Sequence, residues 1–174
     1  MAEKLKVRSP YDGHLIKEVD LDDETRIEQA LTTAEELEQK KPLPIPERIY
    51  ILNKTADLVE AKAEEFARQS AEEGGKPLID SRIELTRAVQ GIREAANSIG
   101  QLTGHEIPMN LTPSSMNRMA FTTREPIGIV AAISAFNHPF NLIVHQVIPG
   151  VAVGCPVIVK PARTTPLSLS LIHI

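Results

Sequence analysis

Glu125 is the last acidic residue of the chain, and the sequence from about residue 120 onward is rich in Val, Ile, Ala, Gly and Pro. Three segments follow one another in this apolar part. The run 127–133 is apolar on both faces, 139–153 suits a helix that begins at a proline, and 157–159 is a short apolar run. A strand, a helix and a second strand in this order predict a βαβ crossover with two parallel strands, covered on both faces.

The preceding part of the chain, residues 1–111, is charged and helical in pattern. Runs at 5–8 and 14–19 flank a Ser-Pro-Tyr-Asp-Gly turn and predict a hairpin. Asp22 and Asp23 are typical of a helix start, and an apolar stripe with helical spacing continues that helix to about Lys40. The stripe consists of Ile27, Ala30, Leu31, Ala34 and Leu37.

Prolines end this helix, and five further segments are predicted before residue 126. They are a helix that begins at Pro46 with an apolar stripe to Val59, a further helical stretch through Phe66 to Glu73 with a left-handed stop at Gly74-Gly75, a helix over 78–99, a loop over 105–117 and a strand over 118–125. At the other end of the chain, Thr164-Thr165-Pro166 opens a last helix by the rule that a cap residue precedes proline. The sequence LSLSLIHI that follows is β-prone and departs from an amphipathic helix.

Composition excludes several classes of protein. The chain has 174 residues, a single cysteine and a net charge of −4, which argue for one domain and against a disulfide scaffold or a nucleic-acid partner. The N-terminus has no apolar segment typical of a signal peptide. The longest apolar stretches, 127–136 and 141–154, are shorter than the ~20 residues of a membrane span. We therefore predict a cytoplasmic protein with no membrane partner.

Polar residues are densest at 134–141, directly after the first apolar strand. Open α/β sheets bind ligands at the carboxyl ends of their strands, so Asn137, the nearby backbone amides and the start of the next helix could bind an anion or an oxyanion. The alternative is that Asn137 only caps the helix that begins at Pro139. Lys160 lies at the end of the second strand and is a second candidate for ligand binding. The alternative interpretation is that Lys160 is only a solvated surface lysine.

Residues 125–166, EPIGIVAAISAFNHPFNLIVHQVIPGVAVGCPVIVKPARTTP, resemble the aldehyde dehydrogenase superfamily. The shared pattern is a strand, an aromatic-Asn-x-Pro turn, a helix, Gly-x-x-Val, and Lys-Pro-Ala before Thr-Pro. Earlier motifs match as well: the SPYDG hairpin, a Pro-x-x-x-Arg helix start near Arg48, a Gly-Lys-Pro helix end and NRMAFTTREPIG. The resemblance extends from about residue 5 to 167 and looks closest to lactaldehyde and phosphonoacetaldehyde dehydrogenases.

The resemblance implies an NAD(P)-binding domain of Rossmann-like topology. Asn137 matches the asparagine whose side-chain amide stabilises the oxyanion of a thiohemiacetal, and loss of one such donor typically costs ~2.7–4 kcal/mol. Lys160 matches the lysine that binds the adenosine ribose hydroxyls, so for both residues the resemblance favours the functional interpretation. The other implied cofactor-binding residues are Ile133, Ser134, Ala135 and Phe136, mostly through their backbone, together with Ala162 and Arg163.

Arg163 stands where NAD-preferring relatives often carry a glutamate that holds the ribose hydroxyls. An arginine removes this acceptor and could pair with a 2′-phosphate, so one hypothesis is tolerance of NADP and the other is an exposed arginine without cofactor contact. Cys155 is rejected as the nucleophile, which in the family lies farther along the chain, and is predicted to be buried. His138 could line the pocket, and His145 is predicted to be packed or at the surface. We predict no metal site.

The resemblance also implies what the chain lacks. The catalytic cysteine, the glutamate that activates water and the second Gly-rich turn fall after residue 174 in family order. We therefore predict an incomplete α/β fold of N-terminal helices and hairpins followed by the first βαβ part of a Rossmann-like parallel sheet. Its parts are a helical region with a hairpin at 5–117, an oligomerisation-type hairpin strand at 118–126 and a truncated cofactor-binding sheet at 127–174.

The functional hypothesis is the N-terminal portion of an oligomeric NAD(P)-dependent aldehyde dehydrogenase that oxidises a small aldehyde and is inactive as this chain alone. The alternative is a non-catalytic interaction or nucleotide-binding module that reuses the fold. A truncated or frameshifted end is a further hypothesis. Since only two parallel strands are encoded, unpaired strand edges predict poor stability or self-association.

Overall fold

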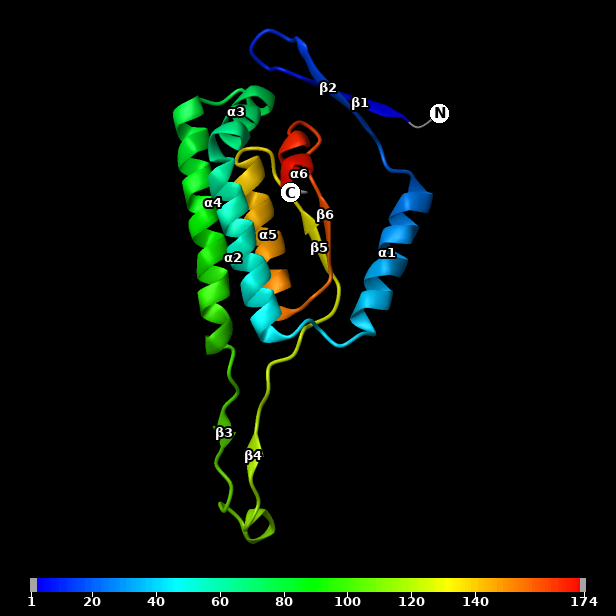
Figure 1. Ribbon diagram of the computed structural model, residues 1–174. Helices are drawn as coiled ribbons and strands as arrows, with labels where there is room; N and C mark the ends of the chain where they lie inside the picture. The colour runs from blue at the N-terminus through cyan, green and yellow to red at the C-terminus, as the bar shows by residue number, and fades with distance from the viewer. Residues whose placement is uncertain (1–2, 173–174) are drawn as a thin grey trace.

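The computed structural model describes residues 3–172, with helices and strands in the order shown in Figure 1. The strands are β1 (Lys4–Arg8), β2 (Leu15–Asp20), β3 (Glu106–Ile107), β4 (Ala120–Phe121), β5 (Val130–Ile133) and β6 (Val157–Lys160). The helices are α1 (Glu24–Glu38), α2 (Ile45–Ala61), α3 (Ala63–Gly74), α4 (Leu78–Ser98), α5 (Pro139–Val153) and α6 (Leu167–Ile172). The predicted fold class, N-terminal helices and hairpins followed by a βαβ unit, is confirmed.

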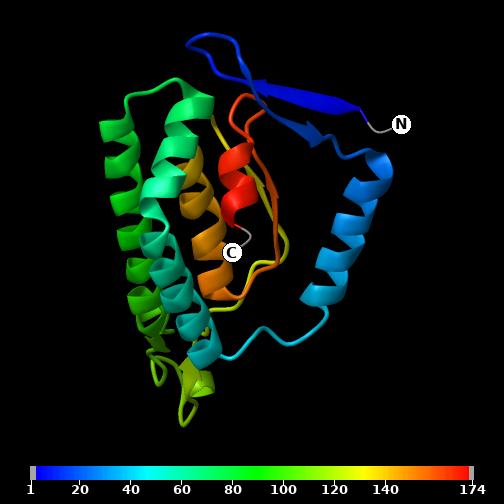
Figure 2. The same ribbon diagram turned by 45° about the horizontal axis from the view of Figure 1, so that its top comes forward.

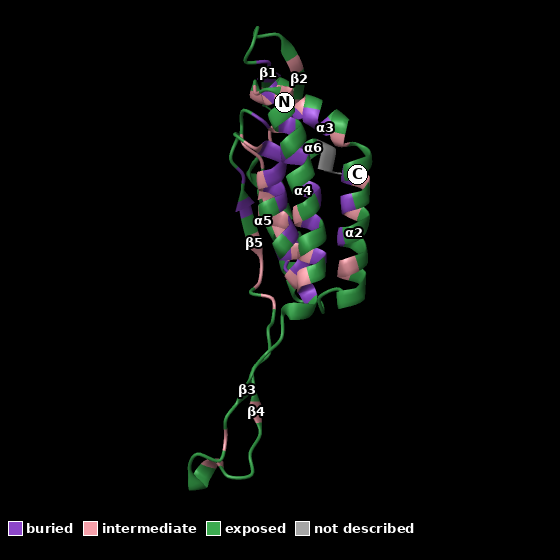
Figure 3. Cartoon of the chain, turned by 90° about the vertical axis from the view of Figure 1, so that its left-hand side faces the viewer, coloured by how far each residue is buried: buried purple, intermediate pink, exposed green. Residues whose placement is uncertain are grey.

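Helices α2, α3, α4 and α5 pack together and hold the hydrophobic core (Figures 1 and 3). α4 contacts the other three helices, and its buried apolar residues recur at helical spacing: Leu85, Ala88, Val89, Ile92 and Ala96. Phe66 of α3 stacks on Phe140 of α5 with 5.1 Å between ring centroids, and both rings are fully buried. The predicted helices over 78–99 and 139–153 are thus confirmed.

The helix predicted from Pro46 and the helical stretch predicted to Glu73 are two separate helices in the structure, α2 and α3. Lys62, with φ −111° and ψ 15°, leaves helical geometry between α2 and α3. α3 ends at the predicted stop, where Gly75 has a left-handed φ of +64°. A β-carbon on Gly75 would lie 2.7 Å from Pro10 Cγ, so glycine also allows the turn of the β1–β2 hairpin to approach this corner closely.

Helix α1 begins as predicted but lies apart from the other helices. Asp23 is its N-cap, and the Asp23 carboxylate accepts the Arg26 N–H at 3.0 Å. Figures 1 and 2 show α1 on the side of β6 away from α5. Ala34 is the one buried member of the predicted apolar stripe, whereas Ile27 and Leu37 are about half exposed. The helical spacing of the apolar stripe therefore predicted α1 correctly. Within the described residues, most of the apolar face of α1 is exposed to solvent.

Strands β5 and β6 are parallel, with Val130 opposite Val157 and Ile133 opposite Lys160, and α5 connects them. The βαβ prediction is confirmed, but β5 is shorter than predicted because Gly128 has a φ of +114°, outside strand geometry. For β5, the expected cover on both faces is wrong within the described residues. Ala132 is buried, while the alternating neighbours of Ala132 on the opposite face are exposed.

Residues 105–122 form an arm that projects from the helices (Figures 1 and 3). Within the arm, β3 and β4 pair antiparallel through Glu106 with Phe121 and Ile107 with Ala120. The predicted loop over 105–117 therefore contains a strand, and the predicted strand over 118–125 contributes only two residues to the ladder. β3 was missed because its two residues form a strand through pairing with β4 and show no apolar alternation of their own.

The β-prone C-terminal sequence is helical in the structure, as the Thr-Thr-Pro signal predicts and the LSLSLIHI pattern does not. Helix α6 begins at Leu167, and the first two residues of α6 are buried. Contacts between this helix start and α3, described below, override the local strand propensity. Residues 173–174, which include His173, lie outside the described residues.

Candidate functional site

The carboxyl ends of β5 and β6 lie side by side. Ile133 pairs with Lys160, and the Ser134 N–H donates to the Lys160 carbonyl at 2.9 Å. The loops that follow, 134–138 and 161–166, therefore leave the sheet at the same edge. This is the edge at which open α/β sheets bind ligands, and the predicted adjacency of the two strand ends is confirmed.

The candidate residues on these loops differ in exposure. Among the candidates at the end of β5 and in the loop after it, Ser134 is buried. The other candidates there are exposed: Ile133, Ala135, Phe136 and Asn137. On and after β6, Ala162 is half-buried and the exposed ones are Lys160 and Arg163. The Lys160 ammonium donates to the Pro161 carbonyl at 3.2 Å. An amide, an ammonium and a guanidinium near one sheet edge can donate hydrogen bonds to hydroxyl or phosphate oxygens of a ligand.

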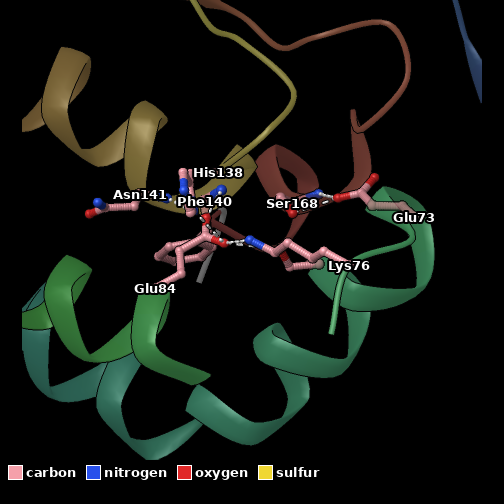
Figure 4. Close-up of polar contacts among 8 residues, drawn as sticks. Glu73, Lys76, Glu84, His138, Phe140, Asn141 and Ser168 are labelled. Atoms are coloured by element: carbon pink, nitrogen blue, oxygen red, sulfur yellow. Dashed lines mark hydrogen bonds and ion pairs between the residues drawn. The ribbon is translucent and has the colours of Figure 1, made fainter. Parts of the chain in front are cut away.

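A buried carboxylate from the helices holds the start of α5 (Figure 4). Glu84 Oε1 accepts the backbone N–H groups of Phe140 and Asn141 at 2.8 and 2.9 Å. Glu84 Oε2 accepts the Ser70 hydroxyl at 3.3 Å and pairs with the Lys76 ammonium. The Glu84 side chain is fully buried, and the Lys76 side chain is 14% exposed. Glu84 thus caps a helix that lies more than 50 positions later in the sequence.

A second buried carboxylate holds the start of α6 in the same way. Glu73 of α3 accepts the Leu167 N–H at 2.7 Å and the Ser168 N–H at 2.8 Å, and it also accepts the Ser168 hydroxyl. Burial raises the pKa of the Glu73 carboxyl above its ordinary value, and these three donors act in the opposite direction. The two helices that follow β5 and β6 therefore both begin on a glutamate from the helical core.

These caps change the interpretation of Asn137 and of the helix start. His138 is the N-cap residue of α5 and makes no side-chain cap hydrogen bond, and the Asn137 side chain is exposed. Glu84 therefore makes the helix-capping contacts that one interpretation of the sequence assigned to Asn137. The expectation that the amides of the α5 start would bind an anion is wrong for Phe140 and Asn141, because these amides already donate to a carboxylate.

The roles of Glu73, Lys76 and Glu84 are not predicted from the sequence. Glu84 lies within the buried stripe of α4, between Ser81 and Ala88 at helical spacing. A glutamate at a core position of a helix is costly unless it is hydrogen-bonded or paired, so its position was the available signal. Glu73 was assigned only to a helix end, and nothing in its local pattern identifies α6 as its partner.

The remaining candidate side chains are placed as follows. Cys155 is free and buried, as predicted. His145 is exposed, and His138 Nδ1 lies 3.8 Å from Glu84 Oε2. Within residues 3–172, no group of three or more His, Cys, Asp and Glu side chains could hold a metal ion. Across the same described span, every helix is too short or too polar to cross a bilayer.

Comparisons with known proteins agree on one family. The model of the aldehyde dehydrogenase family matches residues 1–173. A 3-sulfolactaldehyde dehydrogenase from Priestia aryabhattai is 37% identical over 166 residues, covering 95% of this chain and 35% of the relative. The structure of a glyceraldehyde-3-phosphate dehydrogenase from Methanocaldococcus jannaschii complexed with NADP matches with a TM-score of 0.90 and 32% identity, covering 99% of this chain and 36% of that one.

An NAD-dependent benzaldehyde dehydrogenase from Corynebacterium glutamicum has the same arrangement, with a TM-score of 0.86 and 29% identity over 95% of this chain and 36% of that one. The chain therefore spans about a third of the length of the proteins it matches. The matching fold covers the helices, both hairpins and the βαβ unit described above.

Proposed function

The chain belongs to the aldehyde dehydrogenase family, and from this membership we propose that it forms the N-terminal, cofactor-facing part of an enzyme that oxidises an aldehyde to a carboxylic acid with NAD or NADP. The observation that carries the proposal is the pairing of Ile133 with Lys160, which brings the two candidate loops to one sheet edge. The bound cofactor supplies the hydride acceptor. The nucleophilic cysteine and the glutamate that activates water belong to the part of the family pattern that follows residue 174.

The residues of this chain have distinct roles in the proposal. Asn137 donates its side-chain amide to the oxyanion that develops when the thiolate adds to the aldehyde. Lys160 donates to the ribose hydroxyls of the adenosine, and residues 133–136 line the cofactor through their backbone. The exposure of Asn137 and Lys160 supports these roles, because both groups can reach a ligand without breaking a buried contact.

Nucleotide binding tests the proposal on the chain itself. We expect isothermal titration calorimetry to detect binding of NADP⁺ or NAD⁺, and Lys160→Met to weaken it by roughly 10- to 100-fold, since hydrogen bonds to charged groups contribute ~1.5–3 kcal/mol. Lys54→Met, which removes an exposed lysine on α2, is the matched control and should bind like the parent chain. An interaction module without a nucleotide site would bind neither cofactor in any of the three proteins.

Arg163 provides a test of cofactor preference. We propose that its guanidinium pairs with the 2′-phosphate of NADP⁺, and its exposure beside the β6 end supports this contact. Arg163→Ala should then weaken NADP⁺ binding by about tenfold or more while leaving NAD⁺ binding nearly unchanged. A clear NAD⁺ preference in both the parent chain and the variant would leave Arg163 without a cofactor contact.

We further propose that the arm formed by β3 and β4, which contains residues 118–122 of the predicted 118–126 segment, joins copies of the protein. Exposed apolar side chains on the arm support this role, and they include Leu111, Met119 and Phe121. In the same proposal residues 5–117 and 127–174 together form the cofactor-binding part, the protein works in the reducing cytoplasm, and the chain alone does not oxidise aldehydes.

A further inference from the structure

Each loop at the candidate site ends on a helix that a buried glutamate holds. We propose that Glu84 and Glu73 are positioning residues, with Glu84 fixing loop 134–138, which carries Asn137, and Glu73 fixing loop 161–166, which carries Arg163. The effect on cofactor binding rests on the proposed function, whereas the effect on the loops follows from the contacts alone. Figure 4 shows the two carboxylates on either side of Lys76.

Glu84 holds the far end of loop 134–138. The hydrogen-bonded amides of Phe140 and Asn141 lie three and four positions after Asn137, so a shift of the α5 start moves the Asn137 turn with it. The near end of the loop has its own contacts: Gln146 Nε2 donates to the Ile133 carbonyl at 3.0 Å, and Ser134 is bonded to β6. The turn is therefore held at both ends, and Glu84 is the anchor that comes from outside the βαβ unit.

Glu73 does the same for loop 161–166. Its carboxylate accepts from both of the first two residues of α6, and it reaches them from α3. The near end of this loop is β6 itself, where the Lys160 carbonyl accepts from Ser134. Both loops thus have one end on the sheet and one end on a carboxylate of the helical core, which fixes their spacing across the site.

Because the Lys76 ammonium pairs with Glu84 Oε2, the contact at position 84 requires a carboxylate and not an amide. A glutamine at position 84 would keep one oxygen for the two α5 amides, but its NH₂ group would then face the Lys76 ammonium, and two donors would oppose each other. Because the side chain at position 84 is fully buried, water does not easily supply an acceptor for this NH₂ group. Glu84→Gln therefore weakens the anchor with little change in side-chain volume.

Reciprocal variants test the proposal on the full 174-residue chain. In ¹⁵N-labelled protein, Glu84→Gln should shift the backbone amide resonances of 134–138 and the side-chain amide of Asn137, and leave the backbone amide resonances of 162–165 in place. Glu73→Gln, the matched control, should show the reverse pattern. If the proposed function holds, Glu84→Gln also weakens NADP⁺ binding by about tenfold, as expected for loss of one buried charged contact.

A second variant, Lys76→Met, and nucleotide binding by the parent chain distinguish the possible outcomes. Should Glu84→Gln fail to fold by circular dichroism, Lys76→Met removes the ion pair and leaves the carboxylate, and it should still shift 134–138 selectively. The positioning role is overturned if the variant that folds leaves 134–138 unchanged, or if each variant moves both loops equally. If the parent chain binds no NADP⁺ or NAD⁺ while the loop shifts are selective, the proposed function fails and the positioning role stands.

Discussion

At the scale of single residues, His14 shows how a charge contact joins two distant elements. His14 Nδ1 lies 2.6 Å from Asp12 Oδ1 in the β1–β2 turn, and His14 Nε2 lies 3.2 Å from Glu72 Oε1 on α3. The hydrogen bond with Asp12, followed by that with Glu72, raises the pKa of His14 above its ordinary value of 6.5. The same bond lowers the pKa of Asp12 below 3.8. The charged contact therefore joins the hairpin turn to the end of α3.

These shifts predict a pH window for the docked hairpin. A raised histidine pKa contributes stability that is fully present below about pH 6.5 and is lost as pH rises through the higher folded pKa. A lowered aspartate pKa contributes stability that is present above about pH 4 and is lost at lower pH. Hydrogen exchange of the β1–β2 amides should thus be slowest, relative to unstructured rates, between about pH 4 and 6.5.

A histidine titration followed by NMR checks the residue directly. His14 should titrate above 6.5 in the parent chain, and Glu72→Gln should move its pKa toward that value. A His14 pKa at or below 6.5 in the parent chain would contradict the contact.

At the scale of elements, the segments with a strong apolar period were predictable and those defined by distant partners were not. The 139–153 helix was predicted with its observed bounds because Pro139 starts it and Gly154 ends it within the sequence itself. β3 depends on a partner 13 or more positions away, and its own two residues carry no pattern. Likewise, Asn137 and Lys160 could be placed at strand ends from the sequence, whereas the bond from Glu84 to α5 requires α4 and α5 to be packed together.

The stacked phenylalanines predict the strength of the contact between α3 and α5. Phe66→Ala removes a fully buried ring that stacks on Phe140 and should lower the free energy of unfolding by about 3–5 kcal/mol. Tyr11→Ala, at an almost fully exposed ring in the β1–β2 turn, is the matched control and should change it by less than about 0.5 kcal/mol. Urea denaturation followed by circular dichroism measures both, and equal effects of the two variants would contradict the assignment of the core to the helices.

At the scale of the whole molecule, the chain combines a packed helical core with uncovered apolar surface. The core of α2 to α5 is well buried, whereas α1, one face of β5 and the β3–β4 arm expose large apolar side chains. β5 and β6 form a sheet of only two strands, so each also has an edge without a strand partner within the described residues. A sheet and an arm of this kind favour association with other copies.

Self-association follows as a prediction for the chain in solution. Size-exclusion chromatography with light scattering should give a mass above the 19.1 kDa of one chain. Replacing the exposed arm residues Leu111, Met119 and Phe121 by serine should lower the mass, while serine at the exposed α1 residues Ile27 and Leu37 is the matched control for general loss of apolar surface. A parent chain that elutes as a monomer at all concentrations would contradict the prediction.

The central claim is that the carboxyl ends of β5 and β6 form one nucleotide site, and chemical-shift mapping with NADP⁺ tests it most directly. As NADP⁺ is added to the ¹⁵N-labelled chain, the amide resonances of 133–137 and those of Lys160, Ala162 and Arg163 should shift together with a single dissociation constant. Shifts confined to one of the two loops, or located away from this sheet edge, would contradict the account.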